Sequence, residues 1–217
     1  MTGGRNGRPL VLVHGLSGSG RWWRGVRPQL AQHSVVHVLD VPHIHPRDVP
    51  EWLVGWLDEK GIAEVDLVGH SLGGLTCARV AAAAPDRVGK LVLVAPAGLP
   101  SGRNVVGHLA PLAATLAELP TMAPRLAIDA VRTGPSLLRE ALYAVTHDLR
   151  DELAHIRAPT LLVWGRYDRL VPGHLAEEWL EELADARLVR VDSGHVPMWD
   201  APDALVAALL DFLRTAD

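Results

Sequence analysis

Three residues whose types suit nucleophilic catalysis stand at comparable places in this chain, each just after an apolar, strand-like run. Ser71 is the serine of a Gly-x-Ser-x-Gly motif, and Asp168 and His195 follow two later runs. A serine hydroxyl is a weak nucleophile near neutral pH and needs a base to take its proton. A serine followed by an acid and a histidine therefore predicts a nucleophile together with its proton acceptor.

The neighbours of Ser71 are those that a sharp strand-to-helix turn requires. An apolar run over residues 65–69 precedes the serine, and an Ala-rich helical pattern follows it. In such a turn the incoming strand and the outgoing helix nearly touch, so small residues are needed two positions away on each side. Gly69 and Gly73 meet this need. The helix would also direct backbone N–H groups and a positive dipole end toward the serine.

Apolar runs and amphipathic stretches alternate along the chain, which predicts parallel strands joined by helices. We expect strands near residues 9–13, 35–40, 65–69, 90–95, 160–164 and 186–191. Helical patterns lie near residues 22–32, 50–59, 72–84, 173–184 and 202–215. The expected fold class is therefore α/β, with a mostly parallel sheet of about six strands and helices on both faces.

Four motifs in a fixed order give the chain a family resemblance. A His-Gly pair closes the first apolar run, the Ser71 motif follows, and Asp168 and His195 come last. The order Ser, Asp, His is that of the α/β-hydrolase fold. From about Leu10 to its C-terminus, the chain resembles the serine-nucleophile, esterase- and lipase-like members of that superfamily.

The resemblance implies a role for each motif. Ser71 would attack an acyl carbonyl, His195 would act as general base and then general acid, and Asp168 would hold the imidazole. The backbone N–H groups of Leu16 and Leu72 would bind the oxyanion of the tetrahedral intermediate. The resemblance implies a small-molecule acyl substrate, and the chain shows no signature of a cofactor.

The resemblance also implies how the chain divides. Residues 98–152 contain no strand pattern and read as helices near 104–118, 121–132 and 135–146. An insertion at this place in the fold forms a helical cap, leaving 1–97 and 153–217 as the hydrolase core. Full-length relatives usually have two further strands before the His-Gly strand, and we expect these two strands to be absent here.

The pocket is less well defined by the sequence than the three candidate catalytic residues. Relatives often carry a Gly-x-Gly-x-Ser loop after the second strand, whereas residues 41–50 here contain three prolines, so we expect the pocket and the substrates it accepts to differ from theirs. We name Trp23 and Val196 as candidate pocket residues. The expected reaction is hydrolysis of a carboxylic ester, lactone or thioester of a largely apolar molecule. The alternatives are a C–C-bond hydrolase or lyase/cyclase with the same three residues, and a noncatalytic ligand-binding protein.

Composition agrees with a cytoplasmic globular protein. The chain has 217 residues, 48% of them hydrophobic, and a formal net charge of −4 that favours no nucleic-acid partner. Cys77 is the single cysteine, which excludes an intrachain disulfide, and no apolar run is long enough for a membrane span. The first eight residues lack the apolar region of a secretion signal. The oligomeric state is left open.

Several candidate residues have simpler structural readings. Asp168 could instead cap the helix that follows it, and Asp192 and Asp200 are weaker candidates for the acid because they flank His195. The histidines at 37, 43 and 45 could offer an x-His-x-His metal pair, but no carboxylate or cysteine stands at a recognised ligand spacing. We therefore predict no metal site.

Overall fold

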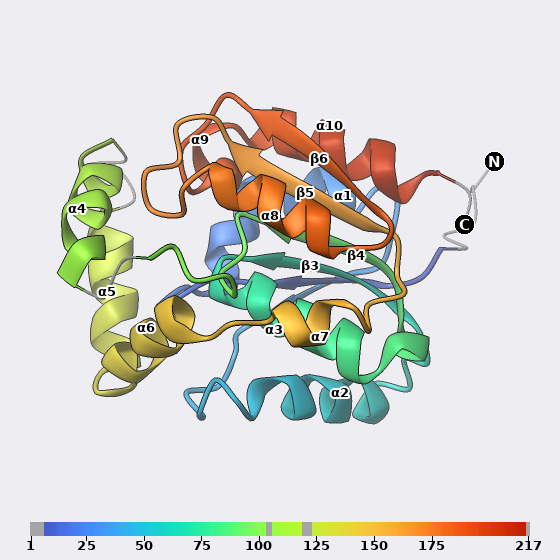
Figure 1. The fold of residues 1–217 in the computed structure, drawn as a ribbon. Helices are drawn as coiled ribbons and strands as arrows, with labels where there is room; N and C mark the ends of the chain where they lie inside the picture. Colours follow the sequence, from blue (N-terminus) through green and yellow to red (C-terminus); the bar gives the residue numbers. More distant parts are fainter. Residues whose placement is uncertain (1–6, 103–105, 119–122, 216–217) are drawn as a thin grey trace.

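A single sheet of six parallel strands, in the spatial order β2-β1-β3-β4-β5-β6, carries the fold (Figure 1). The structure is a computed structural model that describes residues 7–102, 106–118 and 123–215. The strands are β1 (Leu10–Val13), β2 (Val36–Leu39), β3 (Val65–His70), β4 (Val88–Val94), β5 (Thr160–Gly165) and β6 (Ala186–Val191). Every predicted strand is found, so the expected parallel α/β fold is confirmed. No strand precedes β1 among the described residues 7–9.

Helices cover both faces of this sheet. The α-helices outside residues 98–152 are α1 (Arg27–Leu30), α2 (Val49–Glu59), α3 (Leu72–Ala83), α8 (His174–Glu182), α9 (Pro197–Asp200) and α10 (Pro202–Leu213). Short 3-10 helices occur at η1 (Gly20–Gly25) and η2 (Pro85–Arg87). Figure 1 shows α2 and α10 on opposite sides of the sheet.

Side chains of each strand alternate between two separate hydrophobic clusters, one on each face of the sheet. In β1, Val11 and Val13 belong to the cluster that contains residues of α2, α3 and α8, whereas Leu10 and Leu12 belong to the cluster of α1, α9 and α10. All four side chains are buried. This two-sided burial is the reason that the strands read as continuous apolar runs in the sequence.

The helical pattern predicted over 22–32 is split in the structure. Residues Gly20–Gly25 form the 3-10 helix η1, and α1 follows at Arg27–Leu30. The physical reason is Pro28, which lacks an N–H and whose ring would clash with the carbonyl of Arg24 in a continuous α-helix. The split places a tryptophan-bearing 3-10 turn, rather than one straight helix, between β1 and β2.

The described residues between β4 and β5 form a helical insertion. Its elements are η3 (Val106–His108), α4 (Leu109–Glu118), α5 (Ala123–Thr133), α6 (Ser136–Thr146) and α7 (Arg150–Leu153). Figure 1 shows α4, α5 and α6 grouped beside one end of the sheet. Residues 104, 105, 121 and 122 of the predicted helices lie outside the described residues.

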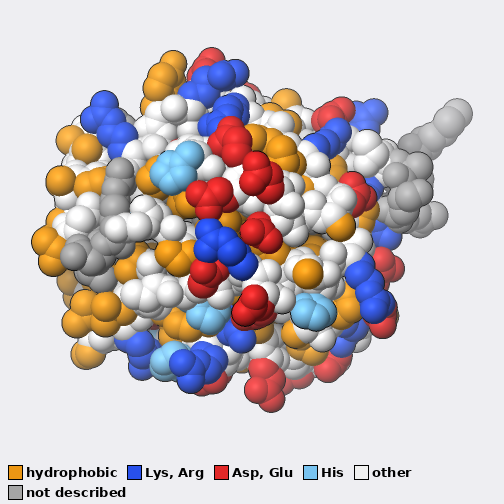
Figure 2. All heavy atoms as spheres, viewed as in Figure 1, with side chains coloured by type: hydrophobic (Ala, Val, Ile, Leu, Met, Phe, Trp, Pro, Cys, Tyr) orange, Lys and Arg blue, Asp and Glu red, His pale blue; other side chains and the backbone are white. Residues whose placement is uncertain are grey.

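The helical insertion also carries much of the exposed apolar surface. Figure 2 shows hydrophobic side chains gathered on the side where Figure 1 places α4, α5 and α6. Large exposed side chains in this segment are Val106, Leu109, Ile128, Val131, Leu138 and Leu142. Within the described part of the chain, no helix is long and apolar enough to cross a membrane. A cytoplasmic location stays a prediction.

We predict that Gly69→Ala destabilises the protein by about 1–3 kcal/mol, the usual effect of overpacking. A Cβ on Gly69 would lie 2.7 Å from Gly74 Cα, so the backbone of α3 would have to move. Gly55→Ala in α2 is the matched control, because its Cβ would meet no atom within 4 Å. That change is expected to stabilise the helix by about 0.5–1 kcal/mol. Urea denaturation measures both, and equal effects would contradict the steric argument.

Candidate active site

Ser71 occupies a strained turn between β3 and α3. Its backbone angles are φ 52° and ψ −119°, a conformation that residues other than glycine adopt rarely and at a cost in free energy. The turn is held from both sides, since Ser71 N–H donates to Val94 O at 3.0 Å and Ser71 O accepts from Ala97 N–H at 3.1 Å. A Cβ at Gly73 would lie 2.7 Å from Val13 O, so α3 begins in close contact with the end of β1. The close approach of strand and helix that the two glycines predict is therefore observed in this turn.

The loop after β1 passes directly beside Ser71. A Cβ on Gly15 would lie 3.1 Å from the Cβ of Ser71 and 2.9 Å from His70 Nδ1, a separation that only glycine permits without displacement. The backbone N–H of the next residue, Leu16, has no hydrogen-bond acceptor among the described residues. Leu72 is the first residue of α3, where helical geometry leaves the N–H without an intrahelical acceptor. Leu72 thus follows the serine directly, and Leu16 follows the glycine that lies beside it; the role of their amides at the oxyanion stays a prediction.

Asp168 and His195 form a buried pair. Asp168 Oδ2 lies 2.8 Å from His195 Nδ1, and the two side chains are 0% and 5% exposed. The other oxygen, Oδ1, accepts from the N–H groups of Leu170 and Val171, each at 2.9 Å. Because the carboxylate only accepts, Nδ1 carries the proton and Nε2 of the neutral ring is left as an acceptor.

The His195 loop is fixed by two further polar contacts. Asp200 Oδ2 accepts from Gly194 N–H at 2.9 Å, and His70 Nε2 donates to His195 O at 2.9 Å. Asp192 instead pairs with Arg166 at the surface, at 2.9 Å. Of the carboxylates near His195, Asp168 alone contacts the imidazole in this structure, whereas Asp200 orients the backbone. Its role in the loop carried no recognisable signal in the sequence.

Ser71 and His195 share one large cavity. Its volume is about 880 Å³, within the range of small-molecule sites, and its lining is mostly apolar. No hydrogen bond joins the hydroxyl of Ser71 to the imidazole in this structure. Such bonds are often loose in enzymes without substrate. The lining residues come from the β1 loop, from the His195 loop and above all from α4, α5 and α6.

Helix α5 is anchored over the cavity by a buried carboxylate. Asp129 Oδ2 accepts from Ser19 Oγ at 3.1 Å and from Trp22 Nε1 at 3.3 Å. Ala127 and Ala130 on the same helix line the cavity, whereas Val131 is 80% exposed. The contact links the helical insertion to the turn that follows β1.

The remaining predicted residues take different places. Val196 lines the cavity, but Trp23 is fully buried in the core and Trp22 lines the cavity in its place. The pocket assignment of Trp23 is corrected accordingly, because η1 turns the first tryptophan rather than the second toward the site. Cys77 is buried within α3.

The histidines at 37, 43 and 45 contact separate partners. His37 packs edge-on against Trp56, and His45 packs against Tyr143. The described residues contain no group of three or more His, Cys, Asp or Glu side chains placed to hold a metal ion.

Comparison with known proteins identifies the family. The profile of the alpha/beta hydrolase family matches residues 10–208, nearly the whole chain. The chain belongs to the alpha/beta hydrolase family. This alpha/beta hydrolase is 31% identical to a pimeloyl-[acyl-carrier protein] methyl ester esterase of Aeromonas salmonicida, with 95% of this chain and 96% of that protein covered. It is 26% identical to a 2-hydroxy-6-oxo-6-phenylhexa-2,4-dienoate hydrolase of Comamonas testosteroni, covering 96% and 88%.

A further relative is longer than this alpha/beta hydrolase. It is the dihydrolipoyllysine-residue acetyltransferase component of the acetoin cleaving system of Pseudomonas putida, 32% identical over 98% of this chain. The chain spans 65% of that protein's length. Among solved structures, a hydrolase from Oleispira antarctica matches with a TM-score of 0.84 at 17% identity, covering 99% of this chain and 93% of that chain. The structural match shows the fold. The family and the sequence relatives support a hydrolase enzyme.

We predict that acidification destabilises the protein through His70. Burial, followed by the charge of His195, holds the pKa of His70 well below 6.5. A histidine with a lowered folded-state pKa takes up protons more readily when unfolded. The free energy of unfolding therefore falls as the pH drops below about 6.5, by at most about 1.4 kcal/mol per pH unit for one group. Urea titrations between pH 7.5 and 5 measure this slope.

His70→Gln is expected to reduce the slope, because the amide has no proton equilibrium in this range. The matched control is His33→Gln at an exposed position. A His70→Gln variant that kept the full slope of the parent protein would contradict the assignment to His70.

Proposed function

We propose that this alpha/beta hydrolase cleaves a carboxylic ester, or a related lactone or thioester, of a largely apolar small molecule. The observation that carries the proposal is the buried Asp168–His195 pair on the wall of the cavity that also holds the strained Ser71. The esterase relatives support an ester as substrate. Leucine, valine and alanine side chains in the cavity lining support an apolar acyl group.

Each step of the proposed reaction is assigned to a residue in or beside the cavity. The oxygen of Ser71 attacks the acyl carbonyl carbon while His195 Nε2 takes its proton, and the alcohol leaves with that proton. Water then adds to the acyl-enzyme carbonyl and gives a proton to His195. His195 returns that proton to the Ser71 oxygen as the bond to the acyl carbon breaks and the acid is released. Asp168 keeps the imidazole in the required tautomer and stabilises its positive charge. The amides of Leu16 and Leu72 donate to the oxyanion.

In this proposal residues 98–152 act as a cap over the core formed by 1–97 and 153–217. The assignment is supported by α4, α5 and α6, which supply many of the cavity residues, and by the anchor between Asp129 and Trp22. A cap of this kind excludes water and limits the length of the acyl group.

Ser71→Ala and His195→Ala are each expected to lower kcat/KM by at least about a thousandfold, because the two residues act as one unit. The measurement is initial hydrolysis of p-nitrophenyl esters from acetate to laurate. Ser34→Ala is the matched control, because Ser34 lies at the amino end of β2, whereas the proposed site lies at the carboxyl ends of the strands. Near-normal activity of either variant would overturn the assignment of the catalytic residues.

A second candidate, cleavage of a carbon–carbon bond or a lyase or cyclase reaction, is favoured by the relative named as a dienoate hydrolase rather than an esterase. Labelling of Ser71 by a fluorophosphonate, followed by mass spectrometry, separates the two. A protein that labels at Ser71 but cleaves no ester in the panel supports this second candidate. A protein that neither labels nor cleaves is a noncatalytic binder.

We predict that Ala130→Leu shifts the preferred acyl chain of the p-nitrophenyl panel toward shorter esters. Ala130 lines the cavity from α5, and the added carbons would occupy space otherwise open to the acyl chain. Val131→Leu is the matched control on the same helix, because Val131 is 80% exposed. An unchanged chain-length profile in Ala130→Leu would show that the acyl chain does not extend along α5.

A further inference from the structure

Ser17 has an unusual position beside the proposed oxyanion site. It follows Leu16 directly, lines the large cavity and is 8% exposed. Its backbone has φ 47°, in the left-handed region that a serine adopts at a cost. The other described non-glycine residues with positive φ are Ser71 and Ala95, which follow β3 and β4. Strained backbone at such places indicates a functional constraint.

The hydroxyl of Ser17 has no hydrogen-bond partner among the described residues, and its oxygen is not fully sealed inside the protein. Ser17 lines the large cavity and also a smaller pocket beside it. A nearly buried polar group normally finds a partner in the protein or in a bound molecule. An unpaired hydroxyl on an apolar wall therefore indicates that a ligand supplies the missing hydrogen bond.

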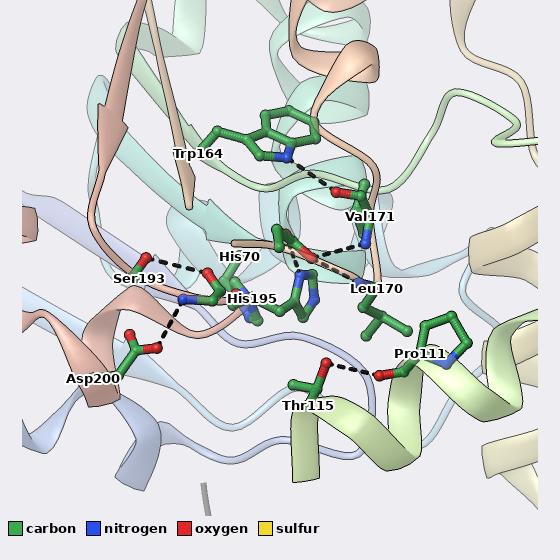
Figure 3. A network of polar contacts seen from close by, with 11 residues as sticks. His70, Pro111, Thr115, Trp164, Leu170, Val171, Ser193, His195 and Asp200 are labelled. Atoms are coloured by element: carbon green, nitrogen blue, oxygen red, sulfur yellow. Dashed lines mark hydrogen bonds and ion pairs between the residues drawn. The ribbon is translucent and has the colours of Figure 1, made fainter. Parts of the chain in front are cut away.

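The other polar groups of the described cavity wall are already engaged. Trp22 donates to Asp129, Thr115 Oγ1 donates to Pro111 O at 2.9 Å (Figure 3), and Ser101 pairs with a neighbouring histidine at 3.2 Å. His70 holds the carbonyl of His195, while its second nitrogen is sealed from the cavity. Apart from the proposed catalytic residues, Ser17 is thus the described lining residue with an unused hydroxyl.

We propose that Ser17 determines specificity by hydrogen bonding to a hydroxyl or keto oxygen on the first or second carbon beyond the scissile carbonyl of the acyl group. The proposal rests on the proposed function, because it takes the amide of Leu16 as the group that holds the carbonyl oxygen. Consecutive Cα atoms lie about 3.8 Å apart, so a partner of Ser17 belongs near the carbonyl rather than at the far end of the chain. The substrate class is therefore an ester whose acyl group carries an oxygen on the first or second carbon beyond the carbonyl and is otherwise apolar.

The test compares ethyl butanoate, ethyl 2-hydroxybutanoate and ethyl 3-hydroxybutanoate, with hydrolysis followed by pH-stat. In Ser17→Ala, kcat/KM for at least one hydroxy ester is expected to fall about fivefold to tenfold, the usual effect of one lost neutral hydrogen bond. Ethyl butanoate is expected to change less than about twofold, since it offers no partner to the hydroxyl. Equal losses for all three esters, or no loss for any, would overturn the proposal.

Two further variants separate recognition from backbone strain. Ser17→Gly also removes the hydroxyl but relieves the left-handed strain, and it is expected to lose the same discrimination as Ser17→Ala. Recovery of the discrimination in Ser17→Gly would attribute the effect to strain and overturn the proposal. Thr115→Val removes a cavity hydroxyl that is already bonded to Pro111, so the ratio between hydroxy and plain esters is expected to stay the same.

Binding measured without chemistry distinguishes this proposal from the proposed function. On a Ser71→Ala background, NMR titration of tryptophan indole signals reports binding, because Trp22 lies on the cavity wall. Adding Ser17→Ala is expected to weaken binding of a hydroxy ester fivefold to tenfold relative to ethyl butanoate. If the parent enzyme hydrolyses none of the esters, the proposed function fails, and this binding ratio still decides the role of Ser17.

Discussion

The close contact between the first turn of α3 and the ends of β1 and β3 is the constraint on which the site depends. At Gly69 and Gly73 the backbones are near enough that a single added Cβ would meet backbone atoms at 2.7 Å. This contact drives Ser71 into its strained conformation and brings Gly15 beside it. The serine, the Leu16 amide and the Leu72 amide are thus positioned by backbone packing rather than by their own side chains.

Hydrogen bonds to the backbone orient the second half of the site. Asp168 is held by two amides of its own loop, and Asp200 holds the amide next to His195. These contacts leave one oxygen of Asp168 for the imidazole. Both loops follow neighbouring parallel strands, β5 and β6, whose ends meet at the same edge of the sheet. A parallel sheet therefore brings together residues that lie far apart in sequence.

The helical insertion supplies much of the cavity wall, whereas Ser71, Asp168 and His195 follow strands of the sheet. Small side chains on α5 line the cavity, a buried carboxylate on the same helix contacts the core, and Ile128 and Val131 of that helix are exposed. The small residues leave room for a ligand, while Asp129 fixes how far the helix stands from the β1 turn.

The sequence by itself determined the order of strands and helices, the parallel fold and the glycine-flanked turn of Ser71, because apolar periodicity and steric need are local properties. It also named Asp168 and His195, whose positions follow from chain order. Only the tertiary structure decided that Trp22 rather than Trp23 lines the cavity and that Asp200 orients the His195 loop. The same holds for the Ser17 hydroxyl, which has no partner among the described residues. Each of these depends on which way a turn directs a side chain and on what lies opposite, and a turn such as η1 carries no periodic signal from which that direction follows.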